Sequence, residues 1–229
     1  NPNTPLARLD QPVYAVKAAE GAQLKAGGHL TAGPDGLAVL GGVGALTPDL
    51  LGDPGFRQIY GTRYALYAGA MANAIASEEL VIAMGKAGML ASFGAGGCSP
   101  ERIEQAILKI QAALPEGPYA FNLLNSPNEP AIEQRTAELY LKYAIHVVEA
   151  SAYLALTPAL VQYRAAGLSR AADGGVKISN RVIAKVSRKE TAKRFLEPAP
   201  QEILDKLTAE GKISAEQAEL ARLVPMADD

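Results

Sequence analysis

The chain has 229 residues, of which 48% are hydrophobic and 20% charged, a composition typical of a globular protein with a large core. The net charge of -2 and the interspersed signs exclude a basic nucleic-acid-binding stripe and favour small or acyl-type substrates. One cysteine excludes an internal disulfide framework, and with two histidines it leaves no Cys/His zinc cluster. Because no apolar stretch is long enough to span a bilayer, we expect a cytoplasmic protein that contacts neither membrane nor nucleic acid.

The first part of the chain, residues 1–57, is rich in turn-forming residues and differs in pattern from the rest of the sequence. Short β-prone pieces at residues 13–16 and 37–40 are separated by glycine pairs, which predicts a small N-terminal cap. Two prolines, Pro48 and Pro54, predict an extended linker over residues 48–56, from this cap into the rest of the chain.

Residues 60–97 read as strand, loop, helix, strand and loop. A strand at residues 64–68 ends in Gly69-Ala70-Met71, a helix begins after Ser77, and a strand at residues 89–93 ends in Gly94-Ala95-Gly96-Gly97. Either loop alone is typical of a tight turn without a ligand, since the pattern is not GxGxxG. Together at the carboxyl ends of two parallel strands, they favour a ligand site.

The same alternation continues to residue 186. A helix begins at Ser99, a second starts after the loop at residues 125–130 and extends to Ala144, and a third begins at Thr157. Strands are predicted at residues 119–124, 146–150 and 182–186, and Asp173-Gly174-Gly175 predicts a hairpin before the last strand. From Lys189 onward the pattern predicts only helices, including one opened by a capping box from Ser214 to Gln217.

About five strands, each followed by a helix, predict a parallel α/β fold, most naturally a TIM (β/α)8 barrel. We expect residues 58–197 to form the first part of such a barrel and residues 198–229 to form an inserted helical pair. The apolar residues of this pair predict either that it packs on the barrel or that it docks a partner. They are Ile203, Leu204, Leu207, Ala218, Leu220 and Leu223.

Five stretches closely resemble the flavin-dependent trans-acting enoyl reductases of polyunsaturated fatty acid and trans-acyltransferase polyketide synthases, within the wider nitronate monooxygenase (2-nitropropane dioxygenase) family. They are YGTRYALYAGAMANAIASEELVIAMGKAGML, FGAGG, GPYAFNLLNSPNEP, VVEASAYLALTPALVQYR and NRVIAKVSR. The resemblance implies an FMN-bound TIM barrel that transfers hydride from NADPH or NADH to an enoyl thioester on an acyl carrier protein. It also implies a histidine-bearing segment and further barrel strands beyond Asp229, so we expect no catalytic residue within this chain. The expected partners are the carrier protein, the C-terminal half of the barrel and, as an alternative assembly, a second copy.

Residues at strand carboxyl ends face the active site of a barrel, and this position selects the candidate cofactor-binding residues. They are Ala70, Met71, Asn73, Gly94, Asn122, Glu149 and Lys185. Lys185 shares a strand face with Ile183, so its amine is expected to point inward, where a cation would stabilise negative charge on a flavin. Glu149 could orient Lys185 through an ion pair or contact the ligand directly, and Asn122 could offer both a donor and an acceptor.

The remaining candidates either contact the flavin without side-chain chemistry or are set aside. Gly94 and Gly96 are expected to make room for the flavin ring, while Met71 would contact it through backbone groups. His146 begins its strand and therefore lies on the stability face, and His29 lies in the cap. Cys98 is interpreted as a small buried hydrophobe, and no metal site is expected.

Two other functions remain open from the sequence. A nitronate monooxygenase-like flavin oxidase would use the same flavin platform with a different substrate. A non-catalytic half-barrel that serves as a docking piece is the third hypothesis.

Overall fold

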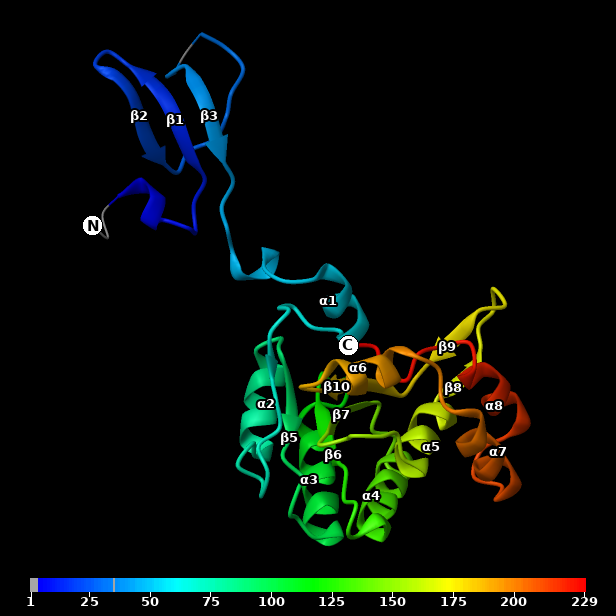
Figure 1. The fold of residues 1–229 in the computed structure, drawn as a ribbon. Coiled ribbons are helices and arrows are strands. Elements are labelled where there is room, and N and C mark those ends of the chain that lie inside the picture. Colours follow the sequence, from blue (N-terminus) through cyan, green and yellow to red (C-terminus); the bar gives the residue numbers. More distant parts are fainter. Residues whose placement is uncertain (1–3, 35) are drawn as a thin grey trace. The chain divides into compact units, whose positions relative to one another are not determined.

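The computed structural model describes residues 4–34 and 36–229, and the chain divides into two compact units (Figure 1). One unit is the N-terminal part of the chain up to Ile59, together with Arg63–Ala65. The other comprises Tyr60–Thr62 and Leu66–Asp229. The predicted cap, residues 1–57, includes four positions that lie outside the described residues.

The N-terminal unit is built on a three-stranded antiparallel sheet with the order β2-β1-β3. Its elements are η1 (Pro5–Ala7), β1 (Val13–Ala18), β2 (Gly21–Ala26) and β3 (Val39–Val43). Val13 and Val16 of the central strand are buried, whereas every residue of β3 is exposed. The small sheet therefore has a thin core formed from one strand.

The segment predicted as an extended linker instead forms η2 (Pro48–Leu50) and the start of α1 (Pro54–Tyr60). Pro54 occupies the first helical position, where its fixed φ suits a helix and its missing N–H costs nothing. Asp53 Oδ1 accepts a hydrogen bond from the Gly55 N–H at 2.8 Å, which satisfies a donor at the helix start. The prediction of an extended path was wrong because Pro48 and Pro54 begin helical turns.

The larger unit contains five parallel strands that pair in chain order (Figure 1). They are β4 (Tyr67–Ala68), β5 (Leu90–Phe93), β6 (Ala120–Leu124), β7 (Val147–Ser151) and β10 (Arg181–Lys185). The predicted α/β architecture with five parallel strands is confirmed. The first strand is shorter than the predicted residues 64–68, since only Tyr67 and Ala68 pair with β5.

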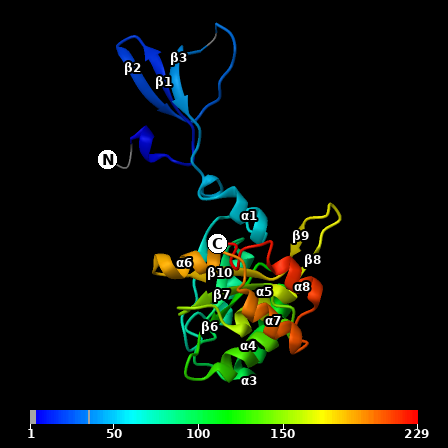
Figure 2. The same ribbon diagram turned by 45° about the vertical axis from the view of Figure 1, so that its right-hand side comes forward.

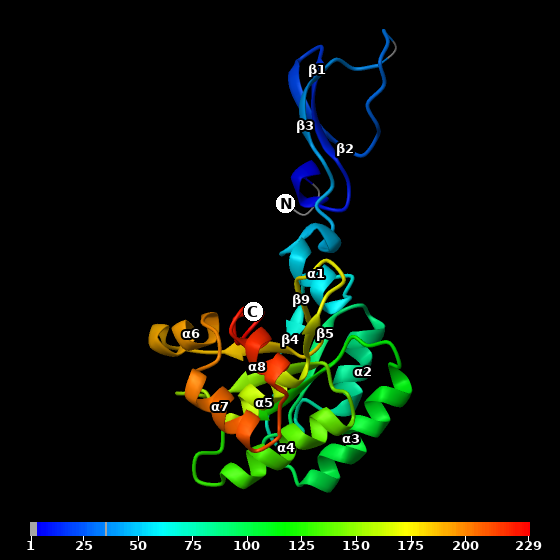
Figure 3. The same cartoon turned by 90° about the vertical axis from the view of Figure 1, so that its right-hand side faces the viewer.

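Four helices follow the first four strands in turn, and Figures 2 and 3 show the larger unit from two further directions. They are α2 (Glu78–Lys86), α3 (Pro100–Ala113), α4 (Pro130–Lys142) and α5 (Pro158–Ala166). Ser77, Ser99 and Thr157 cap α2, α3 and α5 by accepting a backbone hydrogen bond, which confirms these predicted starts. α4 stops before the predicted end at Ala144, because that residue has a φ of 50°.

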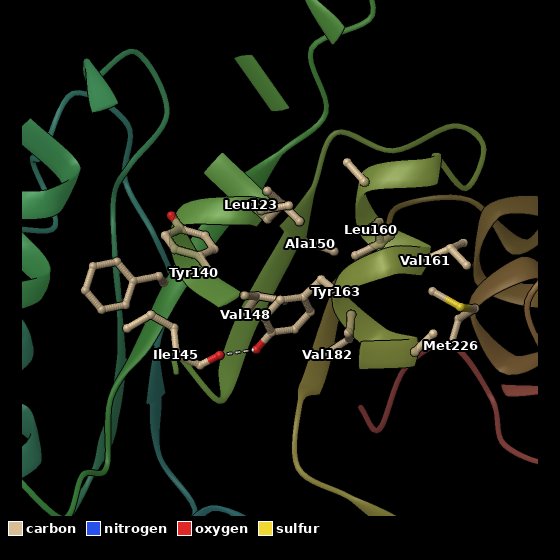
Figure 4. Packing of buried hydrophobic residues seen from close by; sticks show 14 of the residues in the cluster. Leu123, Tyr140, Ile145, Val148, Ala150, Leu160, Val161, Tyr163, Val182 and Met226 are labelled. Atoms are coloured by element: carbon tan, nitrogen blue, oxygen red, sulfur yellow. Dashed lines mark hydrogen bonds between the residues drawn. The ribbon is translucent and has the colours of Figure 1, made fainter. Parts of the chain in front are cut away.

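The helices cover one face of the sheet with a continuous apolar core (Figure 4). Phe121, Val148 and Val182 occupy aligned register positions on this face and are fully buried. Figure 4 shows Val148 and Val182 beside the ring of Tyr163 from α5, whose hydroxyl donates to the Ile145 carbonyl at 2.7 Å. Because this face is apolar along every long strand, polar strand residues are left on the opposite face.

A hairpin and three helices complete the larger unit. They are β8 (Leu168–Arg170), β9 (Val176–Ile178), α6 (Lys189–Leu196), α7 (Gln201–Ala209) and α8 (Ala215–Ala221). The hairpin is confirmed, as is the capping box of α8, in which the Gln217 N–H donates to Ser214 Oγ at 3.1 Å and Gln217 Oε1 accepts from the Ser214 N–H at 2.9 Å. No helix of the described residues combines the length and apolar character needed to cross a bilayer.

The helical pair packs on the larger unit rather than presenting its apolar surface to solvent. Leu204, Leu207 and Leu220 are completely buried, and α7 and α8 both contact α5. Leu223, at 67% exposure, is the one leucine of the predicted apolar set that stays open. The domain itself therefore covers Leu204, Leu207 and Leu220, so these three leucines do not dock a partner, whereas docking through Leu223 stays a prediction.

The end of the chain lies along the outer edge of β10. The Asp228 N–H donates to the Val182 carbonyl at 2.9 Å, and the Ala184 N–H donates to the Asp229 carbonyl at 2.7 Å. The Asp228 carboxylate binds the buried Arg164 guanidinium at 2.7 Å, which also donates to the carbonyls of Asn180 and Pro225. This buried network ties the last residues to α5 and β10.

Candidate functional site

Polar side chains of β6, β7 and β10 share the sheet face that the helices leave uncovered. The parallel register aligns Asn122 with Glu149 and Ile183, and aligns Ser151 with Lys185. Because side chains alternate along a strand, Glu149 and Ser151 point to the same face. The sheet therefore brings three of the predicted site residues, Asn122, Glu149 and Lys185, to one place.

Glu149 is the centre of this site, with only 1% of its surface exposed. Its Oε2 atom accepts hydrogen bonds from the Tyr67 hydroxyl and from the Ala70 N–H at 2.9 Å. Its Oε1 atom accepts from Ser151 Oγ at 3.0 Å and from Lys185 Nζ at 3.2 Å. Four donors fill the acceptor sites of a carboxylate, so the geometry favours the orienting role for Glu149 over direct contact with a ligand.

Lys185 points toward Glu149 on the uncovered face, as the strand alternation predicted. Its Nζ atom donates to Glu149 Oε1 and, at 3.3 Å, to the Ala70 carbonyl. An ammonium group has three N–H donors, so one remains for another acceptor. The side chain is 57% exposed, which leaves this donor accessible from outside.

Asn122 is buried beneath this cluster. Its Nδ2 atom donates to the Glu149 carbonyl at 3.0 Å and to Ser151 Oγ at 2.9 Å. Since the first partner is a carbonyl, which only accepts, the amide orientation is fixed. Both amide donors are used within the protein, so the expectation that Asn122 offers a donor and an acceptor is wrong; only its Oδ1 atom is left to accept.

The two glycine-rich loops lie against each other at the carboxyl ends of β4 and β5. The Asn73 N–H donates to the Gly96 carbonyl at 2.7 Å, and the Ala74 N–H donates to the Gly94 carbonyl at 2.9 Å. A Cβ atom at Gly94 would overlap the Met71 carbonyl oxygen. The absent side chain at Gly94 thus makes room for the backbone of Met71, which corrects the expectation that it is space for a ring.

The first loop connects directly with the charged cluster. Both backbone polar groups of Ala70 are bound, the N–H to Glu149 and the carbonyl to Lys185. A Cβ atom at Gly69 would lie 3.3 Å from Glu149 Oε2 and 3.6 Å from Lys185 Nζ. The loop therefore approaches the ion pair through its backbone, with the Met71 side chain 45% exposed beside it.

Two contributors, Tyr67 and Ser151, were missed by the sequence analysis. Burial, and then the neighbouring Glu149 carboxylate, raise the pKa of the Tyr67 hydroxyl, so it stays protonated and donates. Ser151 was missed because the predicted strand ended at residue 150, whereas β7 includes it. The alternation with Glu149 would have placed Ser151 on the same face, while nothing local indicated that Tyr67 reaches Glu149.

Of the other titratable candidates, His146 lies at the opposite end of β7, whereas Cys98 lies beside the second glycine-rich loop. His146 precedes β7 at its amino end, with Nδ1 3.4 Å from Asn180 Oδ1. Burial raises the pKa of the Cys98 thiol, which lies 3.7 Å from the Gly94 carbonyl oxygen. Within residues 4–34 and 36–229, no three His, Cys, Asp or Glu side chains form a group that could hold a metal ion.

A second buried carboxylate, Glu133 of α4, holds together the loops that follow β6 and β7. It accepts hydrogen bonds from Asn125 Nδ2 at 3.0 Å in the first loop and from the Tyr153 hydroxyl at 2.9 Å in the second. Thr157, the cap of α5, also donates to it. These contacts stiffen the rim beside the charged cluster.

No protein-family model matches the chain. The chain is 50% identical over 226 residues to one of the polyunsaturated fatty acid synthase subunits of Thraustochytrium sp. (strain ATCC 26185 / S-3), an alignment that covers 99% of the chain and 15% of that protein. It is 45% identical over 185 residues to the polyketide biosynthesis protein PksE of Bacillus subtilis (strain 168), covering 80% of the chain and 24% of PksE. The chain thus spans less than a quarter of each relative.

A solved structure has a similar fold over part of its length. The enoyl reductase domain of MlnA, from the macrolactin biosynthesis cluster of Bacillus amyloliquefaciens, superimposes with a TM-score of 0.77 at 41% sequence identity. The match covers 79% of this chain and 42% of that one. The chain is therefore a homologue of a segment of the polyunsaturated fatty acid synthase subunits and polyketide biosynthesis proteins, and its fold matches part of an enoyl reductase domain.

Proposed function

We propose that the chain forms the first five strands of a TIM barrel in an FMN-dependent enoyl reductase. The proposed substrates are enoyl thioesters held on an acyl carrier protein during polyunsaturated fatty acid or polyketide biosynthesis. The observation that carries the proposal is the match to an enoyl reductase domain, because this chain is similar to it in both sequence, at 41% identity, and fold, with a TM-score of 0.77. The similarity to the fatty acid synthase protein and to PksE supports the same biosynthetic setting.

We propose that the uncovered sheet face binds a flat cofactor with oxygen and nitrogen atoms at its edge. Lys185 Nζ keeps one unused N–H donor, and Asn122 Oδ1 remains as an acceptor. Gly69 lets the loop backbone approach Lys185 without an intervening side chain. We propose that Ala70, Met71, Asn73 and Gly94 line this cofactor with their backbone, while Asn122 and Lys185 contact it directly.

The chemistry that bound FMN supplies is hydride transfer from NADPH or NADH to the β-carbon of the enoyl thioester. Lys185 holds a positive charge at the site, where charge stabilisation by a preoriented group is a large contribution to catalysis. Glu149 fixes the direction of the Lys185 amine, and Tyr67 and Ser151 fix Glu149. The chain therefore contributes binding and electrostatic orientation to the proposed reaction.

The test uses the full-length protein that contains this chain. We expect the purified protein to show a flavin absorption spectrum, to release FMN on denaturation, and to consume NADPH or NADH when given an enoyl thioester. Mass spectrometry should find the product two hydrogen atoms heavier than the substrate. A protein that neither retains added FMN nor consumes a nicotinamide cofactor with this substrate would overturn the proposal.

A pair of lysine variants tests the site itself. Lys185→Met removes the charge but keeps an unbranched stem, so it should weaken FMN retention or slow flavin reduction without unfolding the protein. Lys177→Met is the matched control, because Lys177 is an exposed lysine in the β8–β9 hairpin. Equal flavin reduction rates and FMN affinities in the two variants would contradict a role for Lys185.

A further inference from the structure

The segment from the end of β10 through α6 is the most basic stretch of the chain. Residues 185–194 contain five of the 22 lysine and arginine residues and one acidic residue, Glu190. These ten residues carry a charge of +4, whereas the whole chain carries -2. The overall composition therefore conceals a local positive surface.

The cations of this segment are exposed, and few of them have acidic partners. α6 packs inward through Thr191 and Phe195, which leaves its charged residues on the solvent side. In the described part of the chain, no ion pair involves Arg188, Lys189 or Arg194. Among the same described residues, the one acidic partner of Lys193 is the exposed Glu197, at 3.7 Å.

Half of these charges do not serve the stability of the helix. Lys193 and Arg194 lie in the last turn of α6, where the helix dipole favours cations, but Arg188 and Lys189 lie at its start. Arg188 occupies the N-cap without a capping hydrogen bond and Lys189 is the first helical residue, although the positive end of the helix dipole disfavours cations there. Lys189 and Lys193 lie one turn apart, an arrangement that places like charges side by side. The cations at the start of α6 are therefore not explained by the stability of the helix itself.

The basic surface adjoins the candidate site. Three residues separate the end of β10 at Lys185 from the start of α6, so the helix begins at the strand ends where the site lies (Figures 1 and 2). Lys185 itself joins the two, because its amine binds Glu149 in the site. Leu196, at 75% exposure, adds an apolar contact to the charged surface.

We propose that the α6 surface, formed by Arg188, Lys189, Lys193 and Arg194, docks an acidic face of the protein domain that carries the enoyl thioester. The inference rests on the proposed function, because it names the surface by which that substrate reaches the site. Complementary charge speeds the encounter and orients the partner, so the thioester-bearing arm enters beside Lys185. Small free thioesters need no such guidance.

Kinetics on two substrates test this surface in the full-length protein. The double variant Lys189→Glu/Lys193→Glu should raise KM for a carrier-bound enoyl thioester about tenfold at low salt with kcat unchanged. Its kcat/KM for a free enoyl thioester should equal that of the unmodified protein. The difference should shrink at high salt, because mobile ions screen exposed charges.

Lys177→Glu/Arg222→Glu is the matched control, since it makes the same change in net charge at two exposed cations outside α6. Equal effects of the two double variants, or equal losses on carrier-bound and free substrates, would overturn the docking surface alone. Failure of the unmodified protein to reduce either substrate would overturn the proposed function, and the docking inference with it. The two failures are therefore distinguishable.

Discussion

Replacing Glu149 with glutamine removes one charge from the centre of the candidate site while keeping its shape. The carboxylate accepts from Tyr67, Ala70, Ser151 and Lys185, whereas an amide oxygen accepts on one side only. We expect the amide oxygen to take the place of Oε2 and accept from Tyr67 and Ala70, since the Ala70 backbone N–H cannot rotate to another acceptor. The new amide group would then face Ser151 and Lys185.

The loss of stability in Glu149→Gln depends on which hydrogen bonds Ser151 and Lys185 can still form. The Ser151 hydroxyl can rotate to accept from the glutamine amide, but the Lys185 amine meets another donor and would turn to solvent. Because Lys185 is 57% exposed, its lost ion pair costs little stability. Rearranging the buried donors should cost about 1–3 kcal/mol. For a protein of this size that lowers Tm by about 2–12 °C.

The functional effect should be larger than the loss of stability. With Lys185 released, Glu149→Gln should weaken FMN binding about as much as Lys185→Met does. If Glu149 acts by orienting Lys185, the two substitutions should not add. A double-mutant cycle should then give a coupling energy of about 0.5–3 kcal/mol. Thermal unfolding and FMN titration of the four proteins measure both quantities.

Two results would refute this reasoning. Additive losses of FMN affinity in the cycle would mean that Glu149 acts independently of Lys185. An unchanged Tm together with unchanged FMN affinity in Glu149→Gln would mean that the four hydrogen bonds contribute nothing that an amide cannot replace.

Three further substitutions probe the framework around the site. Arg164→Met removes the buried ion pair with Asp228 and leaves that carboxylate only Arg181 Nη1, at 3.2 Å, and the Val182 N–H, at 2.9 Å. Since Arg181 compensates in part, unfolding should cost about 1–3 kcal/mol less in a denaturant titration. The Arg102 guanidinium holds the pKa of Glu78 below its ordinary value of 4.5, so this pair stabilises the fold above pH 4.5 and is lost as Glu78 protonates at lower pH. Glu78→Gln should therefore flatten the acid limb of a plot of stability against pH. Gly94→Ala should displace the first glycine-rich loop, which we expect to lower FMN retention.

Each of these substitutions has a matched control on an exposed or open position. Arg222→Met removes an exposed arginine, and Glu116→Gln removes an exposed carboxylate. Gly41→Ala adds a Cβ where no atom lies within 4 Å. Equal effects of a substitution and its control would contradict the contact on which that prediction depends.

Local features of the sequence determined most of the secondary structure of the larger unit. Ser77, Ser99 and Thr157 are helix caps whose side chains bind the backbone three residues on, so the short-range pattern is sufficient to locate the helix starts. Strand alternation was sufficient to place Lys185 on the face of Ile183. The prolines of residues 48–56 misled the prediction because the same residue suits an extended chain and the first turn of a helix.

The tertiary structure decided which residues of the site form hydrogen bonds with one another. Tyr67 and Glu149 are 82 positions apart in the sequence, and no local pattern indicates that the Tyr67 hydroxyl binds the Glu149 carboxylate. The burial of Leu204, Leu207 and Leu220 likewise depends on where α7 and α8 meet α5. An apolar helix face predicts burial, but only the packing of the chain determines which element covers it. The full use of the Glu149 acceptor sites and of the two Asn122 amide donors is also a property of the assembled sheet, since the bonded groups come from different strands and loops.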